Sequence, residues 1–146
     1  MKKLIYLVPV LIAFATSCAP TGTVAPAITP QGTFTGEFRL LHKKPNQIKF
    51  DTLKANIQVV LSGSKNYQVL GDTATVHAGS KGLFEVGTGA NAGFIGFTDT
   101  TYPTNKVPSK THLSGAYQYY YDGSKFQMVA NSLDTLSLQY DLKKVN

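Results

Sequence analysis

Residues 113–142 read LSGAYQYYYDGSKFQMVANSLDTLSLQYDL, and this stretch decides the fold. At its start and at its end, large apolar side chains recur at every second position, which is the period of a strand with one buried and one solvated face. Between these parts stands Asp122-Gly123, a pair typical of a type I′ hairpin turn with positive φ at both central residues. The stretch therefore predicts strands over 111–121, 125–130 and 136–142, joined by tight turns.

The same period of two runs through the rest of the chain from residue 33 onward. Residues 34–40 and 53–61 alternate in this way, with Leu53, Ala55, Ile57, Val59 and Leu61 on one face of the second segment. Shorter strand candidates are 67–70, 73–78, 82–86 and 93–98, and no window keeps a helical stripe. Eight or nine short strands with local turns predict an all-β, antiparallel up-and-down meander. Closure into a barrel would remove the exposed edges, and a β-sandwich is the alternative.

The segment 112–141 also resembles a known kind of domain. Leu113-Ser114-Gly115, the alternating tyrosines, the Asp122-Gly123 turn and the final Tyr-Asp-Leu resemble the C-terminal hairpins of small lipocalin-like domains in bacterial lipoproteins. This resemblance implies a small barrel with a tendency to hold an apolar ligand.

The N-terminus carries a different signal. Lys2 and Lys3 precede an apolar run of 11 residues over 4–14, which the small residues Ala-Thr-Ser and then Cys18 follow. A basic start, a short apolar segment and small residues form a secretory signal peptide. The apolar run is shorter than the roughly 20 residues that a membrane-spanning helix needs.

The cysteine directly after the small residues resembles the lipobox of bacterial lipoproteins. That resemblance implies a signal peptide over 1–17 and a lipid-modified Cys18 that carries acyl chains such as palmitate. Two or more acyl chains make membrane attachment stable. Ala19 stands where an Asp would signal inner-membrane retention, so we expect the outer membrane, facing the periplasm first and the cell surface second. The alternative is an ordinary signal peptide cut elsewhere, for example after Ala19.

Between the cysteine and the first strand lies a segment of different composition. Residues 19–32, APTGTVAPAITPQG, contain three prolines and two glycines and no charge. Such a segment buries too little apolar surface to fold alone, so we expect residues 18–32 to act as a flexible tether. The folded domain is then 33–146, a usual size for one domain with one core.

Charge excludes some partners. Without the two lysines of the signal peptide, 12 basic residues stand against 8 acidic ones, a formal charge of +4. The basic residues form no stripe, so nucleic acid is not an expected partner. A mildly basic face could rest against anionic headgroups or polysaccharide, or could simply be solvated.

No motif predicts an enzyme or a metal centre. His42, His77 and His112 lie far apart in the sequence, without acidic or cysteine ligands at metal spacing, and we expect them to be ordinary, partly exposed imidazoles. The serine elbow of hydrolases is absent. Residues 87–93 superficially resemble a phosphate loop, but no Lys-Ser/Thr pair or helix follows, so they predict a hairpin loop. We expect no catalytic residue, no metal and no cofactor.

The aromatic residues are the better candidates for a site. A pocket for a mostly apolar ligand with one polar end would suit tyrosines on an inward face. The candidate ligand-binding residues are Phe38, Tyr117, Tyr119, Tyr121 and Phe126; the alternative is that their rings merely fill the barrel. The loop over 99–110 could cover the barrel mouth or have no role.

The sequence leaves two functions open, both non-enzymatic. In the first, a lipid-anchored envelope protein binds a small apolar or amphipathic ligand inside its barrel. In the second, a structural or interaction protein docks an envelope complex through its outer surface, and its interior is packed. A continuous internal void of about 300 Å³ or more would favour the first.

Overall fold

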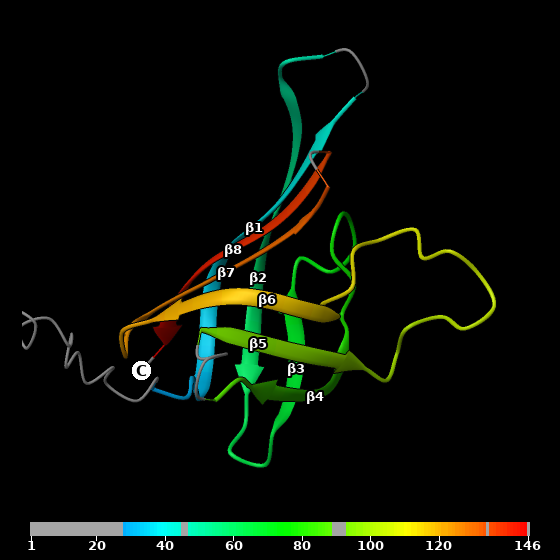
Figure 1. Cartoon of the computed structure of the whole chain (residues 1–146). Helices are drawn as coiled ribbons and strands as arrows, with labels where there is room; N and C mark the ends of the chain where they lie inside the picture. Colours follow the sequence, from blue (N-terminus) through cyan, green and yellow to red (C-terminus); the bar gives the residue numbers. More distant parts are fainter. Residues whose placement is uncertain (1–27, 45–46, 89–92, 134, 146) are drawn as a thin grey trace, which may run out of the picture.

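The computed structural model describes residues 28–44, 47–88, 93–133 and 135–145, which form eight strands and no helix (Figure 1). The predicted signal peptide over 1–17, Cys18 and most of the predicted tether lie outside the described residues. The strands are β1 (Gly32–Lys43), β2 (Phe50–Leu61), β3 (Asn66–Gly71), β4 (Lys81–Val86), β5 (Phe94–Asp99), β6 (Gly115–Tyr121), β7 (Lys125–Ser132) and β8 (Leu136–Val145).

Each strand pairs antiparallel with the next along the chain, and β8 pairs with β1, so the sheet closes on itself. The predicted all-β meander and closed barrel are confirmed, and the sandwich alternative is wrong. Where β1 meets β8, Gly36 lies opposite Leu142. A Cβ atom at Gly36 would lie 2.1 Å from the backbone oxygen of Asp141, so only glycine lets the two strands close the barrel here.

The strands differ in length, and this shapes the molecule. β1 and β2 have 12 residues each, whereas β3, β4 and β5 have six. β3 pairs with β2 only from Ile57 to Leu61, so the outer half of the β1–β2 hairpin projects beyond the barrel (Figure 1). Leu53 lies on this projection and is exposed, although its position in the alternation predicted a buried side chain. It shares the inward face but lies beyond the core.

The core is continuous and rich in aromatic rings. Its largest fully buried side chains come from six of the strands and from the segments that close the barrel end. They include Phe34 and Phe38 of β1, Ile57, Val59 and Leu61 of β2, Ile95 of β5, Tyr117 of β6, Phe126 of β7, Tyr140 and Leu142 of β8, and His77 and Leu113.

The strand predicted over 73–78 is wrong. A turn begins at Asp72, whose carboxylate accepts a hydrogen bond from the hydroxyl of Thr75 at 3.1 Å. Pairing is limited to a single parallel bridge between His77 and Thr111. Local side-chain hydrogen bonds thus compete with sheet pairing here, as is common for Asp and Thr.

The β6–β7 turn differs in detail from the prediction. Gly123 has a φ of 100°, but Asp122 has no positive φ, so the type I′ turn is wrong. The Asp122 carboxylate instead accepts hydrogen bonds from the backbone N–H groups of Ser124 and Lys125, at 2.9 and 2.7 Å. These bonds hold the pKa of Asp122 below its usual value. Aspartate therefore acts here through its side chain rather than through its backbone.

Candidate functional site

The five aromatic residues predicted to bind a ligand lie in the core or against it. Phe38, Tyr117 and Phe126 are completely or almost completely buried, and Tyr119 and Tyr121 are half-buried and pack on the same cluster. Their rings contact one another and the rest of the core in edge-on and tilted pairs, the arrangement that aromatic side chains prefer. Centroid distances are 4.9 Å for Phe38–Tyr140, 5.6 Å for Tyr117–Tyr140 and 4.9 Å for Phe34–Phe126.

In this packing, protein side chains occupy the core of the barrel. The hydroxyls of Tyr117 and Tyr119 are buried and have no hydrogen-bond partner among the described residues, so both side chains contribute to the core as rings. Hollows of about 210 to 500 Å³ among the described residues open instead on the outer surface. A ligand within the barrel would need these rings to move apart.

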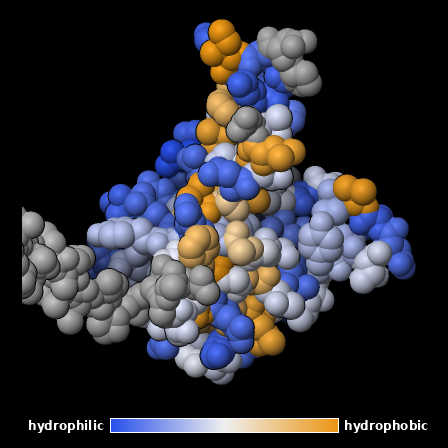
Figure 2. Space-filling view, in the orientation of Figure 1, coloured by the Kyte–Doolittle hydropathy of each residue, from blue (hydrophilic) through white to orange (hydrophobic). Residues whose placement is uncertain are grey.

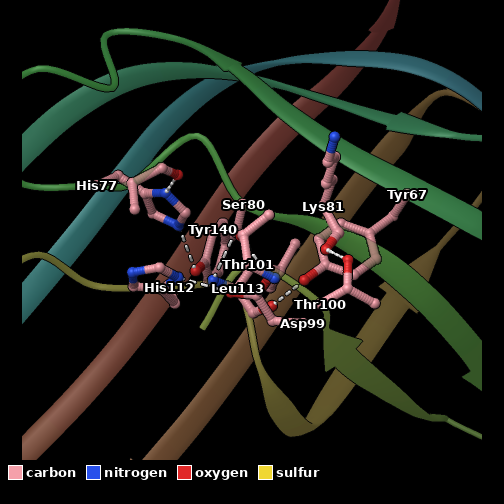
Figure 3. Close-up of polar contacts among 11 residues, drawn as sticks. Tyr67, His77, Ser80, Lys81, Asp99, Thr100, Thr101, His112, Leu113 and Tyr140 are labelled. Carbon is pink, nitrogen blue, oxygen red and sulfur yellow. Dashed lines mark hydrogen bonds and ion pairs between the residues drawn. The ribbon is translucent and has the colours of Figure 1, made fainter. Parts of the chain in front are cut away.

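One end of the core contains polar side chains (Figure 3). His77 is fully buried, which corrects the expectation of a partly exposed imidazole. Its Nδ1 lies 2.7 Å from the carbonyl oxygen of Ala78 and its Nε2 lies 2.9 Å from the hydroxyl of Tyr140. Only a neutral ring with the proton on Nδ1 can donate to the carbonyl and accept from the hydroxyl. Burial lowers the pKa of His77 to about 4, which agrees with a neutral ring.

A second polar pair lies beside the first. The Asp99 carboxylate at the end of β5 lies 2.6 Å from Nδ1 of His112 and accepts two hydrogen bonds from Thr101, at 2.7 and 2.6 Å. Burial alone would raise the pKa of Asp99, but the hydrogen bonds from Thr101 and His112 outweigh it and lower this pKa. The pair ties both ends of the loop over 100–114 together.

These contacts close the barrel end rather than build a reactive centre. Tyr67 donates a hydrogen bond to the carbonyl oxygen of Leu113 at 2.5 Å, and Ser80 accepts one from the Leu113 backbone at 3.2 Å. The loop over 99–110, predicted as a possible cover, thus continues into residues 111–113, which seal this end. Among the described residues no group of three or more His, Cys, Asp or Glu side chains could hold a metal ion.

The largest of these hollows lies on the opposite side of the sheet from the core, over β1, β8, β7 and β6, and has a volume of about 500 Å³. We call it the outer groove. Strand register aligns the outward side chains of the groove, together with neighbouring ones on β1 and β2, in two rows. The Gln139 row contains Lys54, Arg39, Gln139, Val129 and Gln118, and the Asp141 row contains Asn56, Glu37, Asp141, Gln127 and Tyr120.

Hydrogen bonds and ion pairs hold the middle of these rows in place. Nε of Arg39 lies 2.8 Å from Glu37, and a terminal nitrogen of Arg39 lies 3.4 Å from Asp141. Gln127 donates a hydrogen bond to Asp141 at 3.2 Å. Nζ of Lys54 lies 3.2 Å from the second oxygen of Glu37. Arg39 and Asp141 line the groove and Lys54 and Glu37 adjoin it, so the basic and acidic side chains balance and the groove is polar without a net charge.

Several polar groups of the outer groove remain available. In the described part of the chain, the Gln118 amide and the carbonyl oxygens of Gln127 and Gln139 make no hydrogen bond to protein. Each amide offers donors and acceptors in one plane. Tyr120 is 56% exposed at the end of the Asp141 row and presents a flat aromatic face. The groove can therefore form many hydrogen bonds to a neutral polar ligand and stack one ring against it.

Sequence reasoning did not find the outer groove, because its residues come from four strands and only the register aligns them. The signal available in the sequence was the recurrence of glutamine on the polar face of three predicted strands, at residues 118, 127 and 139. Comparison with protein-family models, with curated proteins and with solved structures finds no match for this chain. No helix in the described part of the chain is long and apolar enough to cross a membrane.

Proposed function

We propose that this protein is a non-enzymatic, lipid-anchored protein of the bacterial envelope that binds carbohydrate in its outer groove. The observation that carries the proposal is the pair of polar rows over β1, β8, β7 and β6. It differs from both functions that the sequence left open. It shares with the second, a protein that docks an envelope complex, only the use of the outer surface, and it is preferred to the first because buried aromatic side chains pack the core.

The chemistry of the outer groove favours carbohydrate over other classes of ligand. Sugar hydroxyls both donate and accept hydrogen bonds, and amide, carboxylate and guanidinium side chains match both roles. The C–H face of a sugar ring can lie against the exposed ring of Tyr120. Balanced charge disfavours a strongly anionic ligand, and the polar centre disfavours a protein partner, since the middle of a protein interface is usually apolar.

The remaining parts of the proposal follow from the N-terminal sequence. Acyl chains on Cys18 would hold the protein in the outer membrane, facing the periplasm in preference to the cell surface. Envelope polysaccharide is then the carbohydrate that we propose this domain binds. Envelope protein partners would then be secondary to the carbohydrate.

Removing groove amides should weaken carbohydrate binding. The double variant Gln127→Ala/Gln139→Ala loses hydrogen-bonding groups that contribute about 0.5–1.5 kcal/mol each, so we expect affinity to fall about fivefold or more. Binding is measured by titration calorimetry of residues 19–146, which contain all described strands, against neutral chito- and malto-oligosaccharides. Gln68→Ala, an exposed glutamine on β3, is the matched control and should bind like the unchanged protein.

Two results would contradict the groove proposal. One is an unchanged affinity in the double variant together with normal binding by the control, since the sugar would then bind elsewhere. The other is the absence of binding to either class of oligosaccharide, while fatty acids or phospholipids raise the melting temperature. That second result would favour the other function, in which the protein binds a ligand inside its barrel.

Lipid attachment is tested separately. Substitution Cys18→Ser removes the thiol that would be acylated, so we expect complete loss of incorporation of labelled palmitate in bacterial cells. Persistent labelling of the Cys18→Ser protein would show that the anchor prediction is wrong. The groove measurements use unlipidated protein, so the two results are independent.

A further inference from the structure

Apolar side chains are exposed at the end of the barrel whose backbone projects in Figure 1. It consists of two neighbouring turns, because the backbone N–H of Lys43 donates to the carbonyl oxygen of Thr135 at 2.8 Å. Ile48 is 94% exposed in the first turn and Leu133 is 89% exposed in the second. Phe50 is also exposed and borders the same hollow as Leu133. We call Ile48, Phe50 and Leu133 the apolar tip; Figure 2 shows hydrophobic residues on this projection.

Leu133 has a backbone conformation that argues for a role of its side chain. Its φ is 52°, in the left-handed region that glycine and asparagine occupy with least strain. Glycine occupies this region at Gly71, Gly93 and Gly123. Among the described residues Leu133 is the one apolar side chain with positive φ, and almost all of its surface faces solvent. Strain and exposure both disfavour leucine here, so folding does not explain its presence.

The charges around the apolar tip define what it can bind. Residues 42–51, HKKPNQIKFD, contain three lysines and one aspartate. Lys44 pairs with Asp51 at 2.8 Å, which leaves Lys43 and Lys49 beside Ile48 and Phe50. Over residues 131–137 the sequence adds one aspartate and no basic residue, so residues 42–51 and 131–137 together keep a net positive charge. Exposed aliphatic and aromatic side chains flanked by lysines suit the headgroup region of an anionic bilayer.

We propose that the apolar tip inserts into the surface of an anionic phospholipid bilayer. The tip lies at the Lys43 end of β1, whereas the tether joins at the Gly32 end. Contact at the tip is therefore a second attachment, distinct from the predicted lipid on Cys18. It uses no residue of the outer groove.

The chain contains no tryptophan, so a single introduced tryptophan reports on its own surroundings. Ile48→Trp in residues 19–146 should show a blue-shifted emission with phosphatidylglycerol vesicles, and quenching by lipids brominated on their acyl chains. Val107→Trp is the matched control, because Val107 is 91% exposed on the loop over 100–114. We expect its emission to stay unchanged.

A second measurement tests bilayer binding by the apolar tip without an introduced tryptophan. Substitutions Phe50→Ser and Leu133→Asn together should reduce co-sedimentation with the same vesicles at least tenfold, with an unchanged circular dichroism spectrum. Vesicles of phosphatidylcholine alone should bind more weakly than anionic ones. Equal co-sedimentation of the double variant would overturn the proposal. So would a blue shift of Ile48→Trp that rises with protein concentration without vesicles, since the tip would then contact a second copy of the chain.

Discussion

Substitution Phe38→Ala should lower the free energy of unfolding by about 3–5 kcal/mol, the range for removing a buried aromatic ring. Phe38 is fully buried in the middle of β1. Its ring centroid lies 4.8 Å from that of His77 and 4.9 Å from that of Tyr140, so both neighbours would lose contacts. Because domains of this size have about 5–15 kcal/mol of stability in total, the variant should be close to unfolding. Urea unfolding of residues 19–146, followed by circular dichroism, gives the value.

Phe94→Ala is the matched control for this experiment. Phe94 lies on β5, but its side chain is 43% exposed, so its removal should cost less than about 1 kcal/mol. A loss below about 1 kcal/mol for Phe38→Ala as well would contradict the packed interior. The barrel would then tolerate space around Phe38, as a protein that binds a ligand among these aromatic residues would.

Alternation of apolar and polar residues was enough to predict most of the strands. It works because each strand has one face toward the core, so the period of two appears directly in the sequence. It failed at residues 73–78, where Asp72 and Thr75 form a turn, His77 is fully buried and Val76 packs against the core. Closure of the barrel was predicted because it removes exposed strand edges. The feature that permits closure, the close approach of Gly36 to β8, could not be predicted, because it depends on the register in which β1 pairs with β8.

The outer groove and the apolar tip were harder to predict, for a common reason. Polar residues on the outer face of a strand are under no packing constraint that would mark them in one sequence. Gln118, Gln127 and Gln139 become neighbours through the pairing of β6 with β7 and of β7 with β8. Leu133 likewise reads as an ordinary apolar residue until its φ and exposure are known. The five aromatic candidates could be found from the sequence alone. However, aromatic residues on one face of a strand indicate a packed core as strongly as a binding pocket, so the sequence did not distinguish the two.

Acidification should destabilise the protein between about pH 6.5 and pH 4 through His77. The unfolded chain binds a proton on this imidazole below its ordinary pKa of about 6.5, whereas burial lowers the pKa in the folded protein to about 4. Within this window the unfolded state therefore holds more protons, so the free energy of unfolding falls as the pH falls. The slope approaches about 1.4 kcal/mol per pH unit and the total loss is about 3 kcal/mol. Below pH 4 this contribution no longer changes.

The loss is measured by urea unfolding at pH 7, 6, 5 and 4.5, with His77→Gln as the test variant. Glutamine does not titrate, so the variant should be less stable at pH 7 but lose most of the slope between pH 6.5 and pH 4. His42→Gln, at an exposed position near the end of β1, is the matched control for replacing a histidine of this chain by glutamine. Asp99 has a lowered pKa and so titrates below this window. An equal slope in His77→Gln would place the proton uptake on another group and would contradict a neutral His77 bonded to Tyr140.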